Sequence, residues 1–146
     1  MRHDAFVESI DDDRIVAAIR DAESLSRGEI RVHVAQHPVA DPRSEAAAVF
    51  ERLGMVKTAE RNGVLIFVAP ESRSIAVIGD RDVDARCGQA FWSAVVGGIR
   101  AEFQAGRFTE GIVAAVRAVG DELARHFPRR PGEVDRNELP DEVSRG

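Results

Sequence analysis

The chain contains one cysteine and one lysine among its 146 residues, and each scarcity removes classes of function. Because Cys87 has no second cysteine to pair with, an internal disulfide is impossible, and a cysteine-based zinc site has no expected ligand set. Lys57 follows no glycine-rich loop, which excludes a phosphate-binding P-loop. Arginine supplies the remaining 19 of the 20 basic side chains, but these are spread among acidic residues, so nucleic acid is not an expected partner.

Long apolar runs are also missing. No stretch approaches the ~20 apolar residues that span a bilayer, and the first residues, MRHDAFVESIDDDR, carry acids where a signal peptide needs an apolar core. We therefore expect no membrane span and a cytoplasmic location. With 44% hydrophobic and 31% charged residues, the chain has the composition of a folded protein, and its length suits one domain.

Hydrophobic periodicity predicts the element order helix, strand, helix, strand, strand, helix, helix. The first helix follows Ser9, which with Asp12 resembles a capping box, and Ser44 is the expected cap of the second helix. The expected strands are 30–35, 64–69 and 74–79, and the later helices are expected from Asp80 to about Gly106 and from Thr109 to Pro128.

The two strands within ERNGVLIFVAPESRSIAVIGDRD are apolar on both faces, which is typical of central strands covered by helices on each side. The sequence therefore predicts an α/β sandwich. We expect residues 1–128 to form this single domain and residues 129–146 to form a polar tail. Polar residues of the tail either stay solvated or supplement a site on the domain; they are Asp135, Asn137, Glu138, Asp141 and Glu142.

Strand connectivity gathers polar residues at one edge of the predicted sheet. Two strands joined by a helix normally run parallel, so strands 30–35 and 64–69 begin at the same edge. The hairpin makes strand 74–79 antiparallel, so that strand ends there. We expect the glycines at this edge to allow tight turns. The segments that meet there are Gly28-Glu29, Arg61-Asn62-Gly63 and Gly79-Asp80-Arg81-Asp82.

Oxygen ligands without a soft ligand are offered there by Glu29, Asn62, Asp80 and Asp82. Such a set suits Ca²⁺ or Mg²⁺ better than zinc or copper. The alternative is structural, because Asp80, Asp82 and Asp84 lie at the start of a helix, where aspartate caps the first turn and favours the dipole. The Asn-Gly pair is likewise common in turns. Both hypotheses stay open at this stage.

In the expected topology, the histidines and the cysteine lie apart from the partners that catalysis would require. His33 alternates onto the exposed face of the first strand, and His37 lies toward the edge opposite Asp80, too far for a shared acid/base pair. His126 is explained by the dipole at a helix C-terminus. Cys87 is expected to be a small buried core residue rather than a nucleophile, because no histidine is placed to activate it.

Several pieces of the sequence occur together in a distinctive order and spacing. They are GEIRV, AAAVFERLGM, T-x-x-RNGVLIFVAP, IAVIGD, the tryptophan at position 92, FQAGRFTEGI and VGDELARHFP. From about Ile10 to Glu142 the chain resembles the TPM domain family, which includes thylakoid lumen proteins linked to photosystem II repair and many membrane-anchored or secreted bacterial proteins. The closing NELPDE resembles the tail of a small, soluble bacterial subgroup without an anchor.

The resemblance implies a three-layer α/β/α sandwich with a small mixed sheet and a Ca²⁺ or Mg²⁺ site at the loops of one edge. By position, the family's polar loop residues correspond to Asn62 and Asp80, and less directly to Glu29 and Asp82. Acid phosphatase activity is attributed to plant members, although no nucleophile motif can be matched here. The absence of a signal peptide and of an anchor departs from the commoner layout of the family.

Three hypotheses of function follow. The first is a soluble binding module with a divalent-cation site that serves a regulatory or structural role. The second is a metal-assisted phosphatase, in which the cation polarises a phosphoryl oxygen and activates water. The third is an adaptor that binds an unknown protein partner through its tail or a helix face, without metal.

Overall fold

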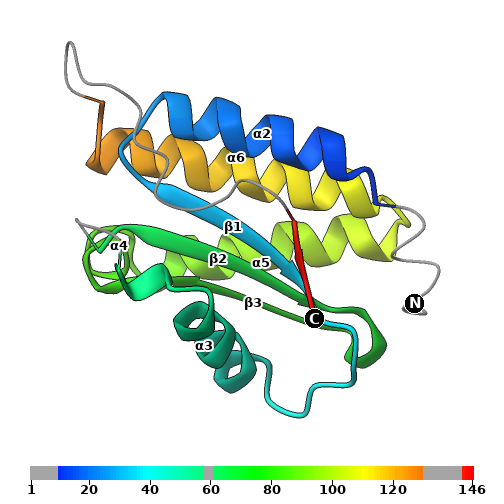
Figure 1. The fold of residues 1–146 in the computed structure, drawn as a ribbon. Helices are drawn as coiled ribbons and strands as arrows, with labels where there is room; N and C mark the ends of the chain where they lie inside the picture. Colours follow the sequence, from blue (N-terminus) through cyan, green and yellow to red (C-terminus); the bar gives the residue numbers. More distant parts are fainter. Residues whose placement is uncertain (1–9, 58–60, 130–142) are drawn as a thin grey trace.

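The computed structural model describes residues 10–57, 61–129 and 143–146. The strands form one mixed sheet in the order β3, β2, β1, β4, with helices on both of its faces (Figure 1). The predicted three-layer α/β/α sandwich is therefore confirmed. In the described parts of the chain, no helix is both long enough and apolar enough to cross a membrane.

The predicted element order is confirmed, with two differences. The helix expected from Asp80 to Gly106 is divided, because Gly88 adopts φ 82° and ψ 162°, a conformation that only glycine adopts easily. A short strand in the tail also joins the sheet. The described elements are α2 (Asp12–Ser24), β1 (Glu29–Val34), α3 (Pro42–Arg52), the 3₁₀ turn η1 (Met55–Lys57), β2 (Gly63–Ala69), the 3₁₀ turn η2 (Pro70–Ser72), β3 (Ser74–Gly79), α4 (Arg81–Cys87), α5 (Gln89–Gln104), α6 (Phe108–His126) and β4 (Ser144–Arg145).

The strands run in the directions that their connections predict. β1 is parallel to β2, with Glu29 opposite Gly63. β2 is antiparallel to β3, with Val64 opposite Gly79. The starts of β1 and β2 therefore share one edge of the sheet with the end of β3, beside α4 (Figure 1). We call this end of the sheet the acidic edge. Its polar side chains are Glu29, Asn62, Asp80 and Asp82, and three of the four are acidic.

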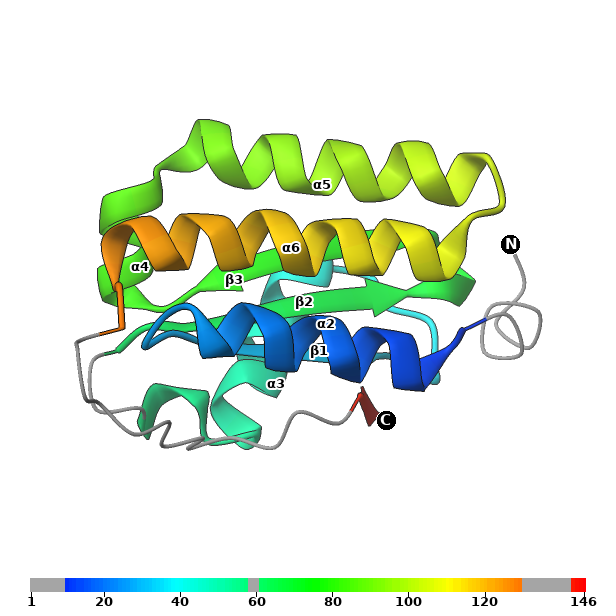
Figure 2. The same ribbon diagram turned by 90° about the horizontal axis from the view of Figure 1, so that it is seen from above.

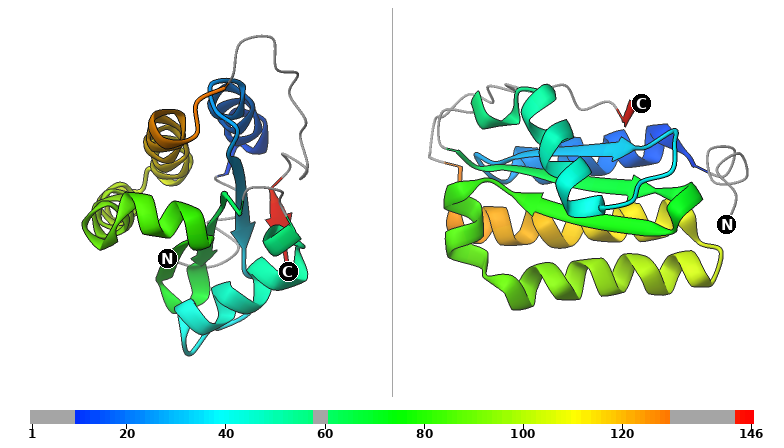
Figure 3. Two further views of the ribbon diagram at one scale, coloured as in Figure 1. Left: turned by 90° about the vertical axis from the view of Figure 1, so that its left-hand side faces the viewer. Right: turned by 90° about the horizontal axis from the view of Figure 1, so that it is seen from below.

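The two faces of the sheet bury separate apolar cores. α2, α5 and α6 cover one face, and α3 covers the other (Figures 2 and 3). All residues of β2 are buried, including Val64 and Ile66 on the first face and Leu65 and Phe67 on the second. This agrees with the central position predicted from its unbroken apolar run.

Two predicted helix caps require correction. Ser9 lies outside the described residues, and Asp11 caps α2 by accepting a hydrogen bond from a backbone N–H of the first turn. α3 is capped by Asp41, whose carboxylate accepts a hydrogen bond from the Ser44 N–H, so Ser44 lies inside the helix. Pro42 is tolerated in the first turn because its missing N–H would have no partner there, and the helix thus begins earlier than expected.

The polar face of β1 is buried, so the predicted exposure of His33 is wrong. Arg31 and His33 are 6% and 2% exposed. The His33 ring stacks on Phe67, and its Nδ1 lies 2.9 Å from Ser144 Oγ in β4. Burial, followed by the charges of Arg52 and Arg31, lowers the pKa of His33 to about 4. Both faces of β1 are therefore buried, and its polar residues, Arg31 and His33, lie on a covered face of the sheet rather than in solvent.

The described end of the tail is part of the sheet. Ser144–Arg145 pairs in parallel with β1. Gly146 extends this pairing: its N–H donates to the Val34 carbonyl at 3.2 Å, and its carbonyl accepts from the Gln36 N–H at 2.7 Å. The tail residues considered above as additional ligands all lie outside the described residues, namely Asp135, Asn137, Glu138, Asp141 and Glu142.

Candidate functional site

Backbone hydrogen bonds join the three segments of the acidic edge. The Glu29 N–H donates to the Asn62 carbonyl at 3.3 Å, and the Asp80 N–H donates to the Gly63 carbonyl at 2.8 Å. The side chain of Asn62 is buried, and its Nδ2 donates to the Arg27 carbonyl at 2.8 Å. The segments that strand connectivity brings to this edge are thus held in fixed positions relative to one another.

Asp80 both caps α4 and pairs with Arg61. Its Oδ1 accepts a hydrogen bond from the Arg81 N–H at 2.7 Å, which is the capping role expected of an aspartate there. Arg61 donates from Nε to Oδ2 at 2.7 Å and from Nη2 to Oδ1 at 2.8 Å. The Asp80 side chain is 5% exposed and that of Arg61 is 34% exposed. A nearly buried carboxylate is therefore compensated by a bidentate guanidinium.

The role of Arg61 could not be predicted from its position in a turn. Its φ of 52° is left-handed, whereas none of the glycines at the acidic edge has a positive φ, so the left-handed residue of this turn is Arg61 and not a glycine. Gly28 and Gly79 instead leave room for neighbours. A β-carbon would lie 2.6 Å from Leu123 at the first position and 2.6 Å from Trp92 at the second. One feature of the sequence could have indicated the ion pair: Arg61 precedes the apolar hairpin and Asp80 follows it, so the hairpin brings the two side chains to the same edge.

The other two acidic side chains of this edge have different surroundings. Glu29, at the first position of β1, is 4% exposed. Asp82 lies in the first turn of α4, where its side chain is 43% exposed and pairs with Arg81 at 3.1 Å. One carboxylate is therefore nearly buried within the edge, while the other lies at the protein surface.

The oxygen donors of the acidic edge suit a hard cation by type, but Asp80 is already neutralised. Both of its oxygens accept hydrogen bonds from Arg61. Among the residues that the structure describes, Glu29, Asp80 and Asp82 do not bring three ligand atoms within 4.8 Å of one another. A cation at Asp80 would therefore have to displace the Arg61 guanidinium, and the donor set fits Ca²⁺ or Mg²⁺ only after that exchange.

A different set of ligand-type side chains lies between α4 and α6. The ligand atoms of Cys87, Glu122 and His126 all lie within 4.8 Å of one another. The expectation that no histidine is placed near Cys87 is wrong, because His126 lies beside it. The expected buried core position is only partly correct, since Cys87 packs against the core but is partly exposed. α4 packs on the C-terminal end of α6 (Figure 2), and this tertiary contact cannot be deduced from the sequence separation.

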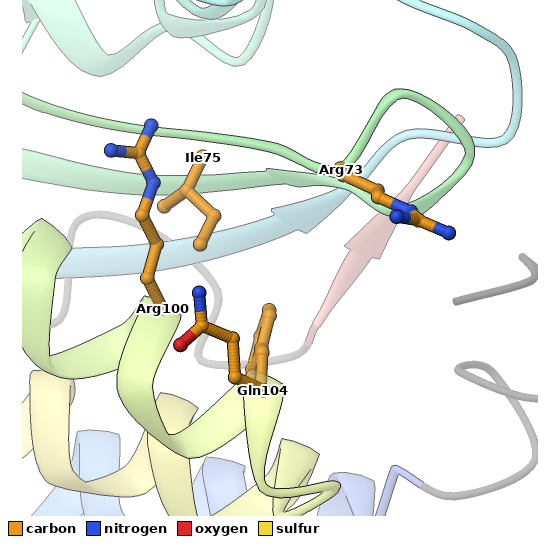
Figure 4. Close-up of a pocket in the computed structure, with 5 residues that line it drawn as sticks. Arg73, Ile75, Arg100 and Gln104 are labelled. Carbon is orange, nitrogen blue, oxygen red and sulfur yellow. The ribbon is translucent and has the colours of Figure 1, made fainter.

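A hollow of about 410 Å³ lies between β3 and α5 (Figure 4). Its lining combines two arginines and an amide with the apolar side chains of Ile75 and Phe103, and Arg73 points away from Arg100 and Gln104 (Figure 4). Arg73 precedes β3 and Asp80 follows it, so the hollow and the acidic edge are separated by the length of a strand, roughly 20 Å. The lining residues are Arg73, Ile75, Arg100, Phe103 and Gln104.

Comparisons with known proteins agree with this architecture. The family model described as the TPM domain matches residues 3–122. No curated protein matches the chain. The NMR structure of the BA42 protein from the psychrophilic bacterium Bizionia argentinensis is similar, with 37% sequence identity, a TM-score of 0.84 and a match that covers 92% of each chain. This chain therefore belongs to the TPM domain family.

Proposed function

We propose that this TPM domain is a binding module for a hard divalent cation, Ca²⁺ or Mg²⁺, at the acidic edge. The proposal is supported by one observation above all: Asp80 is nearly buried at the meeting point of three chain segments, and a positive charge already compensates it there. Asn62, Glu29 and Asp82 belong to the same edge and offer further oxygen donors.

Arg61 serves in this proposal as the internal counter-ion of Asp80. In the cation-free protein, its guanidinium neutralises the carboxylate and keeps it in place as the cap of α4. Arg61 is the more exposed partner of the pair, so its side chain is the one that can move into solvent. A bound cation would supply the positive charge in its place and could link the edge to an anionic partner.

A thermal-unfolding series with Ca²⁺, Mg²⁺ or EDTA tests this proposal. A ligand present at a hundred times its dissociation constant stabilises the folded state by about 2.7 kcal/mol, which raises the unfolding midpoint by several degrees. We expect this rise in the native protein and its loss in Asp80→Asn. Arg61→Gln should strengthen binding about tenfold, because the cation no longer has to displace the guanidinium from Asp80.

Arg107→Gln is the matched control, since Arg107 also pairs with a carboxylate, Glu102, but at the far end of α5. Its response to cations should equal that of the native protein. If millimolar Ca²⁺ and Mg²⁺ change neither the native protein nor Arg61→Gln, the edge is a structural ion pair and the adaptor hypothesis is favoured. A phosphatase would require, in addition, turnover that depends on the cation and disappears in Asp80→Asn.

A further inference from the structure

Three side chains with different ligand atoms meet where α4 and α6 end. Glu122 and His126 are four residues apart on α6, so they lie on the same face of that helix. Their facing atoms, Oε2 and Nε2, are 3.3 Å apart. Cys87, the last residue of α4, adds a sulfur within 4.8 Å of both.

Groups of both charges surround this cluster: Glu122 and Asp84 favour a cation there, and Arg125 opposes it. Cys87 and His126 are the last residues of their helices, and a helix C-terminus carries partial negative charge. Burial, and then the charge and hydrogen bond of Glu122, raise the pKa of Cys87 to about 11, with a further contribution from Asp84; Arg125 acts in the opposite direction. The thiol thus keeps its proton beside a carboxylate, and a metal ion can take the place of that proton.

We propose that Cys87, Glu122 and His126 form a binding site for a transition-metal dication of the Zn²⁺ class, separate from the acidic edge. Thiolate and imidazole ligands select Zn²⁺ and similar ions over Ca²⁺ and Mg²⁺. Three protein ligands leave a fourth position open to water or to another ligand. Ligand atoms around tetrahedral Zn²⁺ lie roughly 3.3–3.6 Å apart, so the cluster closes around the ion by side-chain movements of about 1 Å.

Neighbouring residues hold two of the ligands in place. Arg125 pairs with Glu122 Oε1 at 3.3 Å, which leaves Oε2 facing His126. Arg86 donates to the His126 carbonyl at 3.4 Å, and its guanidinium lies 4.9 Å from the ring centre of Phe127. Such outer contacts orient the ligands of metal sites. Gly88 follows Cys87 directly and ends α4, which places the thiol at the end of the helix.

Binding would replace the thiol proton with the metal ion and release that proton to solvent, with no oxidation or reduction. The affinity should therefore increase with pH over the range in which the thiol is protonated. Because Cys87 is the only cysteine of the chain, any thiolate-to-metal signal reports this site alone.

Titration of the full chain with Co²⁺, followed by competition with Zn²⁺, tests the proposal. We expect one Co²⁺ per chain, a thiolate-to-cobalt charge-transfer band, and displacement of Co²⁺ by Zn²⁺ but not by excess Mg²⁺. Cys87→Ser should abolish the band, and His126→Gln should weaken binding by at least about tenfold. His37→Gln is the matched control, because His37 is exposed and pairs with Glu45 elsewhere.

Asp80→Asn should leave this signal unchanged, which separates this site from the one proposed at the acidic edge. The circular dichroism of each variant verifies that it is folded. The inference is overturned if Co²⁺ at equimolar protein gives no charge-transfer band, or if folded His126→Gln and Glu122→Gln bind Zn²⁺ as tightly as the native chain.

Discussion

Arg61 and Asp80 form a bidentate ion pair in which the carboxylate is nearly buried and the guanidinium is partly exposed. The pair joins the turn before β2 to the start of α4. Replacing one member is therefore expected to differ from replacing both, because a single replacement leaves a charge without its partner.

Arg61→Gln should destabilise the fold, although less than the loss of a fully buried partner would, because water reaches this pair. The double variant Arg61→Gln/Asp80→Asn should recover part of this loss, since asparagine is neutral and still caps a helix. Urea denaturation of the two single variants and the double variant measures the coupling. Strict additivity of the two changes would contradict the interaction.

Gly79→Ala should destabilise the protein by about 1–3 kcal/mol, because the new β-carbon would lie 2.6 Å from the Trp92 ring. The matched control is Gly97→Ala in α5, where the added carbon meets nothing within 4 Å. That change should stabilise the helix by about 0.5–1 kcal/mol. Fluorescence of the only tryptophan, during denaturation, measures both effects. Equal effects of the two substitutions would refute the packing argument.

His33 should make stability sensitive to mild acid. Its pKa is about 4 in the folded chain, below the ordinary value of 6.5, so the unfolded chain binds more protons between these values. This contribution is fully present above about pH 6.5 and is lost as the pH falls toward 4. From about pH 7 to pH 5 the loss should amount to roughly 2 kcal/mol.

Denaturation at both pH values, with His33→Gln and His37→Gln compared, isolates this effect. The pH dependence should shrink in His33→Gln and persist in His37→Gln, whose histidine is exposed. An NMR titration that places the His33 ring near its ordinary pKa would show that the ring is not buried as described.

The contacts of β4 provide a comparison between a partly buried hydrogen bond and an exposed ion pair. Ser144→Ala removes the hydroxyl beside His33 Nδ1 and should cost about 0.5–1.5 kcal/mol. Arg145→Gln removes a 2.7 Å pair with Asp12 that is open to solvent, which should cost at most about 1 kcal/mol and less at high salt. Denaturation at low and high salt measures both changes. A larger cost for Arg145→Gln that is independent of salt would contradict this ranking.

Three strands of the sheet, β1 to β3, could be predicted because their determinants are local, whereas β4 was missed. The apolar run of β2 and the glycine-flanked hairpin specify strand type and direction without knowledge of the helices. The same reasoning failed for His33, because alternation gives the two faces of a strand but does not reveal that α3 covers the second face or that β4 pairs beside β1. Helix starts were missed where Asp41 precedes a proline, since Ser44 also fits a cap pattern.

The candidate sites, too, could be predicted from the sequence only in part. Connectivity placed Glu29, Asn62 and Asp80 at one edge, but the hydrogen bonds from Arg61 depend on a left-handed backbone that no propensity favours. The meeting of Cys87 with His126 depends on the packing of α4 against α6, elements far apart in the sequence. Side-chain partners that meet across a tertiary contact can be identified only when the fold is known.

The pairing of β4 with β1 also orders events during synthesis. His33 and Ser144 are 111 positions apart, so the ribosome makes most of the chain before the outer side of β1 can be covered. Until residues 144 and 145 emerge, β1 presents unpaired backbone groups that could pair with another nascent chain. Because residues 144 and 145 close this side of the sheet, a chain cut before them would expose the free edge of β1 to pairing with another chain.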